Sequence, residues 1–292
     1  MNIGGKMNGI FIIDKPKGVT SRDVVNEIQK KFKTRKVGHT GTLDPLATGV
    51  LIVCVGSATK LVDILTSNDK EYEACATLGI QTDTLDNTGN VLNDIISLKS
   101  KDEIINTLNK FKGKYLQEVP KYSAIKINGK KLYEYARENI DVPLPKREVN
   151  IKDIELIEDI KYIDNHTIFT FKCTVSKGTY IRSLIRDIAT SLETYGIMTD
   201  LRRTRQGRFS IDQSCKLSSI KDTDLINIED IFDYKKIEID ESIKKKILNG
   251  AKVPNIYNED KIIFTLNNKV IAIYEKEDNY LKPYKMLRGG IL

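Results

Sequence analysis

The sequence predicts an α+β fold in two parts, a larger body over residues 1–232 and a small β-rich appendage over residues 233–292. The chain of 292 residues can bury a sizeable core, and 40% of its residues are hydrophobic. Strand-like and helix-like patterns are mixed along the body without the strict strand–helix–strand rhythm of a doubly wound parallel sheet. After residue 232 the pattern changes to short apolar segments separated by asparagine-rich turns.

The first elements follow from apolar spacing and from helix-start signals. Gly9–Asp14 is a short apolar run, which predicts a buried strand. Thr20 and Asp23 have the spacing of a capping box, and the apolar residues that follow predict a helix up to Phe32. The glycine-punctuated segment Gly38–Gly49 is predicted to be a loop without regular structure.

The remaining elements are predicted from alternating or helical spacing. Strands are predicted at Val50–Val55, Lys70–Leu78, Val149–Ile157 and Thr167–Val175, and helices at Lys60–Leu65, Lys101–Phe111 and Tyr180–Leu192. The turn signal Asn128-Gly129 separates a strand segment at Tyr122–Ile127 from a helix at Leu132–Arg137. In the appendage, strands are predicted at Ile262–Leu266 and Val270–Tyr274.

The composition narrows the class of protein. The 47 Lys and Arg residues exceed the 40 Asp and Glu residues, and the net charge of +7 suits either a polyanionic partner or a lysine-rich solvated surface. No apolar run reaches the ~18–20 residues that cross a membrane, and the N-terminus lacks a signal-peptide pattern, so a cytoplasmic protein is expected. The four cysteines show no C-x-x-C spacing and there are only two histidines, so no metal site is expected.

The segment Gly38–Gly49 (GHTGTLDPLATG) is the densest candidate for chemistry. Its three glycines permit positive φ angles and close approach by a ligand, and Pro45 restricts the backbone of Asp44 to extended geometry. A carboxylate on such a loop can be aimed at a substrate. The alternative interpretation is an Asp-Pro turn beside a strand, and the spacing alone does not exclude it.

The same segment closely resembles the catalytic motif of bacterial TruB-type tRNA pseudouridine synthases. Further segments resemble that family in the same order: Asp14–Ser21, Lys70–Tyr72, Leu78-Gly79, Thr82–Thr84, Tyr122–Lys126, Ser176–Ser183 and Leu201–Arg203. The resemblance covers roughly residues 8–210. It implies a mixed, largely antiparallel sheet flanked by helices. It weakens beyond residue 232, where the family often carries a small RNA-binding domain of the PUA type.

The resemblance implies an isomerase that converts one uridine in the T loop of tRNA, at position 55, to pseudouridine. The N1–C1′ glycosidic bond breaks, the uracil rotates, and C5 bonds to C1′. This chemistry requires no metal, redox group or other cofactor. The implied partner is the T arm of tRNA, and the resemblance suggests a monomer.

The resemblance assigns the catalytic roles to Asp44, Tyr72 and Arg182. Asp44 corresponds to the family aspartate, which must be ionised to act as a nucleophile at C1′. Burial favours the neutral form of a carboxyl group, and Arg182 corresponds to the arginine that opposes this effect. Tyr72 corresponds to the tyrosine that packs on the target base. On pattern alone, Arg182 could be a surface helix charge and Tyr72 a cross-strand aromatic residue.

Three further residues are implied to contact the flipped nucleotide. The target base must leave its stack, at a cost of a few kcal/mol. His39 corresponds to the family histidine that stacks when this happens, although a lone histidine in a loop is more often a turn or hydrogen-bonding residue. Tyr180 and Leu201 correspond to residues that line the uracil pocket, although their periodicity alone would place both in the core. Lys15 and Pro16 are expected to shape the loop beside the pocket rather than to contact the substrate.

Two basic clusters are candidates for RNA contact. The first resembles the family's RNA-gripping insertion, at about residues 110–145, where seven lysines and interleaved tyrosines accompany one acidic residue between positions 110 and 131. Its candidate RNA-binding residues are Lys121, Lys126, Lys130 and Lys131. Arg202 and Arg203 represent the second cluster. A solvated lysine-rich face is the alternative. Val119 stands where the family usually has a second proline, so the path of this segment is not fixed by the resemblance.

Three alternative functions are compatible with parts of the sequence. A synthase of the same family acting on another RNA would have the same pattern around Asp44. A non-catalytic RNA-binding protein would be expected to lack the aspartate or Arg182, and both are present. A nucleoside hydrolase or glycosylase would also use a carboxylate at C1′, but it would release free uracil.

Overall fold

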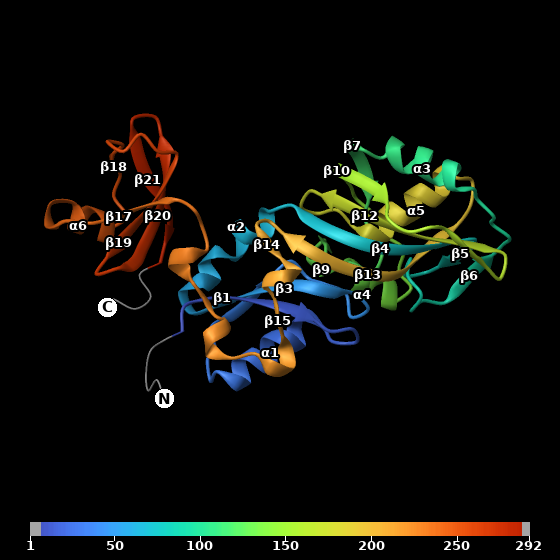
Figure 1. Ribbon diagram of the computed structural model, residues 1–292, viewed down its shortest axis with the longest axis horizontal. Helices are drawn as coiled ribbons and strands as arrows, with labels where there is room; N and C mark the ends of the chain where they lie inside the picture. The colour runs from blue at the N-terminus through green and yellow to red at the C-terminus, as the bar shows by residue number, and fades with distance from the viewer. Residues whose placement is uncertain (1–6, 288–292) are drawn as a thin grey trace. The chain divides into compact units, whose positions relative to one another are not determined.

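The computed structural model describes residues 7–287 (Figure 1). The chain forms two compact units. The first unit consists of Met1–Pro45, Val50–Thr66 and Asp212–Leu292, and the second of Leu46–Gly49 and Ser67–Ile211. Each unit therefore combines segments that are far apart in the sequence. The predicted domain limit at residue 232 falls within the first unit, so the proposed domain division stays a prediction.

The first unit contains a buried sheet around strand β1 (Gly9–Lys15). Its other strands are β2 (Val37–Thr40), β3 (Thr48–Val55), β15 (Cys215–Lys216) and β16 (Ile226–Asn227). The strand order is β15-β1-β3, with β15 parallel to β1, β16 antiparallel to β1 and β2 antiparallel to β3. β1 and β3 are almost completely buried, as their continuous apolar runs predict.

Helix α1 (Ser21–Lys31) begins as the sequence predicts. Thr20 is its N-cap, and the side chains of Thr20 and Asp23 form the expected reciprocal capping box. The helix buries Val24, Val25 and Ile28, which are the apolar residues at helical spacing. The short helix predicted at Lys60–Leu65 is a 3₁₀ helix, η1 (Gly56–Leu61), followed by α2 (Val62–Ser67). Four further 3₁₀ turns are η2 (Ile211–Gln213), η3 (Leu217–Ser219), η4 (Asp222–Asp224) and η5 (Ile228–Asp230).

The last segment of the first unit forms a separate five-stranded sheet, which confirms the β-rich appendage. Its elements are β17 (Lys235–Glu238), α6 (Glu241–Leu248), β18 (Val253–Pro254), β19 (Lys261–Leu266), β20 (Lys269–Glu277) and β21 (Tyr280–Met286). The strand order is β17-β19-β20-β21-β18. Residues including Ile247, Phe264, Tyr274 and Leu281 form a hydrophobic core of its own.

The second unit is a largely antiparallel sheet, as the resemblance implies. Its main strands are β4 (Lys70–Leu78), β7 (Gly113–Glu118), β10 (Lys146–Leu156), β12 (His166–Val175) and β13 (Gly196–Gln206), in the order β13-β4-β12-β10-β7. All of these neighbours are antiparallel. Thr48 and Gly49, at the start of β3, pair in parallel with β13, so the pairing is mixed. Two short strands extend it, β11 (Lys161–Ile163) beside β12 and β14 (Phe209–Ser210) beside β13.

Two helices pack against this sheet. α3 (Lys101–Lys110) lies against β10, and α5 (Ile181–Ser191) lies along β13. α5 buries Ile181, Leu184, Ile185 and Ile188, which confirms the apolar face that the sequence predicts. A separate hairpin is formed by β5 (Ile80–Thr82) and β6 (Val91–Asp94).

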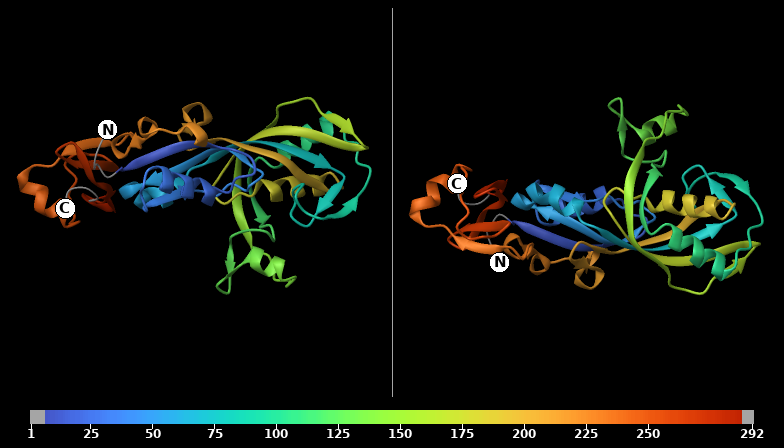
Figure 2. Two further views of the ribbon diagram at one scale, coloured as in Figure 1. Left: turned by 90° about the horizontal axis from the view of Figure 1, so that it is seen from below. Right: turned by 90° about the horizontal axis from the view of Figure 1, so that it is seen from above.

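Residues 119–145 form an arm between β7 and β10. The arm carries the hairpin β8 (Lys126–Ile127) and β9 (Lys130–Lys131), followed by α4 (Leu132–Arg137). Asn128 and Gly129 both have positive φ, 49° and 83°, as the predicted two-residue turn requires. Figure 2 shows the arm standing out from the strands of the second unit. The insertion is shorter than the expected 110–145, because Gly113–Glu118 pair with β10 as a regular strand of the sheet.

The prediction of a structureless loop over Gly38–Gly49 is wrong at both ends. Val37–Thr40 pair with β3 as strand β2, and Thr48 already belongs to β3. Only Gly41–Ala47 remain outside regular structure. The glycines and the proline of the segment favour turns, so the sequence pattern does not indicate the short strand pairing on each side of them.

Candidate active site

Asp44 lies in the loop between β2 and β3, and its side chain is half-buried. The preceding residue, Leu43, is fixed by one buried hydroxyl group. Ser21 Oγ accepts a hydrogen bond from the backbone N–H of Leu43 at 2.9 Å and donates one to the carbonyl of Leu43 at 3.1 Å. Because Ser21 is the first residue of α1, the start of the helix holds the loop beside the carboxylate.

The residue after Asp44 is fixed from the other side. The carbonyl of Pro45 accepts hydrogen bonds from the backbone N–H of Gly18 at 2.8 Å and from Lys15 Nζ at 3.4 Å. The side chain of Lys15 is completely buried, and its ammonium group also donates to the carbonyls of Pro16 at 2.9 Å and Val19 at 2.6 Å. Lys15 therefore shapes the loop, as expected. Both neighbours of Asp44 are held by the segment Asp14–Ser21.

Glycine is required in this loop at two positions. Gly41 has a φ of 78° and Gly49 a φ of 97°, which other residues rarely adopt. A Cβ atom at Gly49 would also lie 2.2 Å from the carbonyl oxygen of Arg203, so a larger residue would push β3 away from β13. Gly38 has neither constraint, because a Cβ atom there would make only ordinary contact, 3.6 Å from Val62.

His39 belongs to β2 and lies opposite Val53 of β3. Its side chain is half-buried. His39 is therefore a strand residue in the same unit as Asp44 and not a turn residue, while its interpretation as a hydrogen-bonding residue stays open.

In the second unit, Tyr72 lies in the middle of the sheet. It is on β4, opposite Cys173 of β12 and Arg203 of β13, and only 7% of its surface is exposed. The cross-strand placement matches the alternation of β4. It fits both the structural and the substrate-contacting interpretation of this tyrosine.

Arg182 lies in the first turn of α5 and is 6% exposed, so it is not a surface helix charge. Its guanidinium group donates hydrogen bonds to the carbonyl of Thr84 at 2.9 Å and to the carbonyl of Tyr122, in the arm, at 3.0 Å. Asp86 Oδ2 lies 3.8 Å from the same group. Asp86 is a residue that the sequence did not single out, although it follows the Thr82–Thr84 motif.

Tyr180 and Leu201 are both well placed for a pocket wall or for packing. Tyr180 is the N-cap residue of α5, in extended conformation and half-buried, and the guanidinium of Arg147 lies 6.0 Å from the centre of its ring. Leu201 is on β13 opposite Ala74 and is 6% exposed. Periodicity alone would have assigned both residues to the core.

The candidate RNA-binding lysines all lie on the arm. Lys121 forms an ion pair with Asp141 at 2.7 Å, and Lys130 pairs with Glu138. Lys131 Nζ donates to the hydroxyl of Tyr133 at 3.2 Å and lies over its ring. Lys126 is exposed and forms no ion pair within residues 7–287. The arm thus presents cations and tyrosines together.

The second basic cluster divides into two environments. Arg202 is half-buried and donates a hydrogen bond to Thr48 Oγ1 at 3.3 Å. Arg203 is completely buried, so its guanidinium group is not on the surface that RNA would contact. The alternation of β13 explains this outcome, since neighbouring strand residues face opposite sides. Nearby, burial and then the positive charge of Arg203 lower the pKa of Lys70 to about 8.

Within residues 7–287, no three His, Cys, Asp or Glu side chains gather in a geometry that could hold a metal ion. In the same part of the chain, no helix has the length and apolar character to span a membrane. Burial raises the pKa of the Cys54 thiol to about 12, as expected of a cysteine that acts as a small hydrophobic residue.

Comparisons with known proteins agree with the motifs. Residues 29–181 match the family model of the TruB family pseudouridylate synthase N-terminal domain, and residues 182–244 match that of the tRNA pseudouridylate synthase B C-terminal domain. The chain is 42% identical to tRNA pseudouridine synthase B of Lactobacillus acidophilus and 40% identical to that of Bacillus subtilis, and both alignments cover 96% of this chain and 98% of the relative. A chain in the crystal structure of a Cbf5–Nop10–Gar1 complex is similar with a TM-score of 0.70 and 25% identity, over 97% of this chain and 86% of that chain.

Proposed function

The chain belongs to the TruB family of pseudouridine synthases, and from that membership we propose that it isomerises the uridine at position 55, in the T loop of tRNA, to pseudouridine. The family makes the chain a tRNA pseudouridine synthase. What we propose beyond this membership is the position of the modified uridine and the roles of the individual residues.

The observation that carries the proposal is the support of Asp44 from both sides. Ser21 holds the backbone of Leu43, and Lys15 and Gly18 hold the carbonyl of Pro45. A carboxylate between two fixed residues has a defined direction, which attack on C1′ of a ribose requires. An ordinary Asp-Pro turn would not need a completely buried lysine beneath it.

The other residues take roles that their chemistry permits. Arg182 takes the role of the family arginine that accompanies the catalytic aspartate, and Tyr72 packs on the target uracil. His39 stacks in place of the flipped base, while Tyr180 and Leu201 line the pocket in which the uracil turns. The reaction uses no cofactor in this proposal, because every bond that breaks is replaced within the same nucleotide.

The RNA is held by the arm through Lys121, Lys126, Lys130 and Lys131, together with Arg202. Exposed cations neutralise phosphates, and the neighbouring tyrosines can stack on unpaired bases. Arg203 is left out of this set because it is buried. Residues 233–292 act as a PUA-like RNA-binding domain. The cytoplasmic location and the monomeric state suggested by the sequence stay predictions.

The proposal is tested by tritium release from tRNA transcripts labelled at C5 of uridine, since isomerisation exchanges that hydrogen. We expect release from the wild-type transcript and none when the uridine at position 55 is replaced by cytidine. Release from both transcripts would show that the target lies elsewhere. Release of free uracil would instead support a glycosylase.

A further inference from the structure

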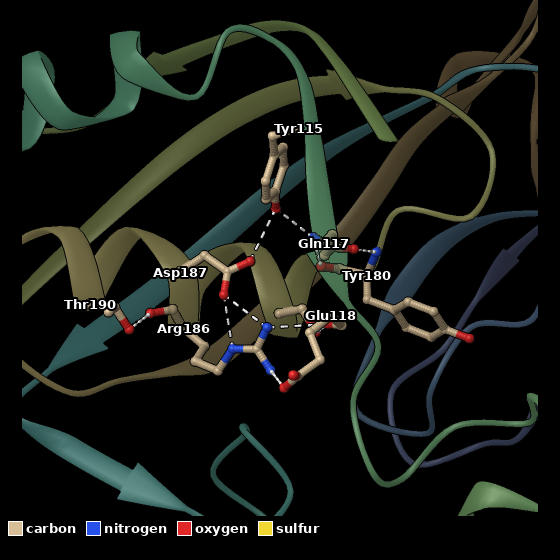
Figure 3. Close-up of polar contacts among 8 residues, drawn as sticks. Tyr115, Gln117, Glu118, Tyr180, Arg186, Asp187 and Thr190 are labelled. Atoms are coloured by element: carbon tan, nitrogen blue, oxygen red, sulfur yellow. Dashed lines mark hydrogen bonds and ion pairs between the residues drawn. The ribbon is translucent and has the colours of Figure 1, made fainter. Parts of the chain in front are cut away.

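The arm is joined to helix α5 at its base, and Gln117 is at the centre of this joint (Figure 3). Gln117 is the second-last residue of β7, and its side chain is completely buried. Its neighbour Leu116 faces the other side of the strand and is 68% exposed. A buried carboxamide has to find hydrogen-bond partners, because leaving it unsatisfied costs about 1–3 kcal/mol.

Gln117 finds these partners on the backbone of Tyr180. Its Oε1 atom accepts a hydrogen bond from the N–H of Tyr180 at 2.8 Å, and its Nε2 atom donates to the carbonyl of Tyr180 at 3.1 Å. Tyr180 is the N-cap of α5, and its own side chain does not cap the helix. One side chain therefore binds both backbone polar groups of the residue from which the phenol ring projects. Figure 3 shows that ring pointing away from the joint.

The orientation of the carboxamide is fixed by a third hydrogen bond. Nε2 of Gln117 also donates to the hydroxyl of Tyr115 at 2.7 Å, and that hydroxyl donates to Asp187 Oδ2 at 3.3 Å. Burial raises the pKa of Tyr115, which keeps the phenol protonated and able to donate to Asp187. A flipped carboxamide would place its oxygen against the carbonyl of Tyr180 and its NH₂ group against the N–H.

A second set of contacts joins the next residue to the same helix. The carbonyl of Glu118 accepts hydrogen bonds from Ser183 Oγ at 2.8 Å and from the guanidinium of Arg186 at 3.2 Å. The carboxylate of Glu118 also lies 3.2 Å from Arg186. A cavity of about 540 Å³ is lined by Glu118 and Arg186 of this joint, by arm residues such as Tyr122 and Ile140, and by Asp83 and Leu85.

We propose that Gln117 is a positioning residue for the isomerisation: it holds the backbone of Tyr180, and with it the first turn of α5, in the geometry that the turning uracil needs. The inference rests on the proposed function, in which Tyr180 lines the uracil pocket. The uracil must stay aligned with C1′ while it exchanges N1 for C5. A displacement of about 1 Å at such a site can cost about 100-fold in rate.

The test begins with Gln117→Met, which keeps the length of the side chain and removes its donor and acceptor. At saturating tRNA, we expect the single-turnover rate of pseudouridine formation to fall by about 10- to 100-fold. The KM for tRNA should change by less than about 3-fold, because the exposed residues of the arm are untouched. The matched control is Leu116→Ala, which alters the neighbouring exposed side chain and should leave both constants unchanged. A wild-type rate in Gln117→Met would overturn the proposal.

A double-mutant cycle shows whether Gln117 acts through Tyr180. If it does, Gln117→Met should cost much less in a Tyr180→Leu background than in the wild type. Equal losses in both backgrounds would contradict the positioning role. A wild-type rate for Tyr180→Leu alone would instead contradict the proposed function of Tyr180, so the two failures can be told apart.

Gln117→Glu keeps the experiment decisive if Gln117→Met does not fold. A protonated carboxyl group offers the same acceptor and donor, whereas the carboxylate faces the carbonyl of Tyr180 and lies near Asp187 and Glu118. The rate of this variant relative to wild type should therefore rise as the pH falls from about 8 to about 6, since burial favours protonation. Burial raises the pKa of Tyr115, so its phenol stays protonated over this range and does not alter the ratio. A ratio independent of pH would overturn the proposal.

Discussion

At the scale of single residues, Asp44 is held through the backbone of the residue on each side of it. Ser21 contributes two hydrogen bonds to Leu43 with one buried hydroxyl group. We predict that Ser21→Ala lowers the single-turnover rate by about 10-fold, because the carboxylate loses its direction. The dissociation constant for tRNA should stay near the wild-type value. Rapid-quench kinetics and filter binding measure the two quantities.

Thr20→Ala is the matched control for this prediction. Thr20 is the neighbouring residue and caps α1, so its loss should reduce the free energy of unfolding by about 1 kcal/mol. It makes no contact with Leu43 among the hydrogen bonds of the loop. An equal loss of rate in Thr20→Ala would mean that the stability of the helix, not the hold on Leu43, supports catalysis.

Lys70 is a residue for which the pH dependence of stability can be predicted. Burial, with the nearby positive charge of Arg203, lowers its pKa from 10.5 to about 8. The unfolded chain therefore binds the proton more tightly than the folded chain does. The cost to stability is fully present below pH 8 and disappears above about pH 10.5.

Lys70→Met should consequently stabilise the protein relative to wild type at pH 7, by up to about 3 kcal/mol. The lost hydrogen bond from Lys70 Nζ to the carbonyl of Asn68, at 2.6 Å, reduces this gain. The advantage of the variant should shrink between pH 8 and pH 10.5, because the wild-type lysine becomes neutral in both states. Urea unfolding at pH 7 and pH 10 measures the difference, and an advantage that grows with pH would contradict the prediction.

At the scale of elements, the cations of the arm differ in their partners: Lys121 and Lys130 pair with acids, and Lys131 contacts Tyr133. Lys121 and Lys130 must exchange Asp141 and Glu138 for phosphates, whereas Lys126 forms no ion pair in the described chain. Lys126→Ala should weaken tRNA binding and reduce the slope of log affinity against log salt by about 0.7–0.9. Lys101→Ala, which removes an ion-paired lysine of α3, is the control and should leave the slope unchanged. Identical slopes in Lys126→Ala and wild type would contradict an RNA contact.

The sequence predicts elements well where apolar spacing and capping signals agree. β4, α1, α3, α5 and β12 lie within one or two residues of their predicted limits. The sequence does not predict β13, because its arginines obscure the alternation of a strand, and it places β7 within the lysine-rich stretch that resembles the basic insertion. These two strands owe their position to pairing with β4 and β10, which local sequence does not encode.

The site was predictable only in part, for a related physical reason. The motif around Asp44 and its glycines could be recognised from turn chemistry, and Gly49 shows why such a residue is needed. The roles of Ser21 and Gln117 depend on contacts with Leu43 and Tyr180, far away in the sequence. Arg202 and Arg203 are adjacent in the sequence and are therefore predicted to bind RNA together. Neighbouring residues of a strand face opposite sides, so only Arg202 is partly exposed.

At the scale of the whole molecule, residues 233–292 carry 12 basic and 9 acidic residues, and the strands from β17 to β21 within them form a sheet with its own core. Removing them should weaken tRNA affinity by about 10-fold or more, because one of two linked binding surfaces is lost. The single-turnover rate at saturating tRNA should change much less. Filter binding and tritium release, with circular dichroism as a check on folding, measure these effects. Unchanged affinity would contradict the role of this segment in RNA binding.

The most direct measurement of the central claim compares wild type with Asp44→Asn by tritium release from C5-labelled tRNA. The amide has nearly the shape of the carboxylate but cannot act as a charged nucleophile. We predict no pseudouridine formation by Asp44→Asn at any enzyme concentration, with tRNA affinity close to that of wild type. Tritium release by Asp44→Asn at a rate comparable to wild type would contradict the assignment of Asp44 as the catalytic residue.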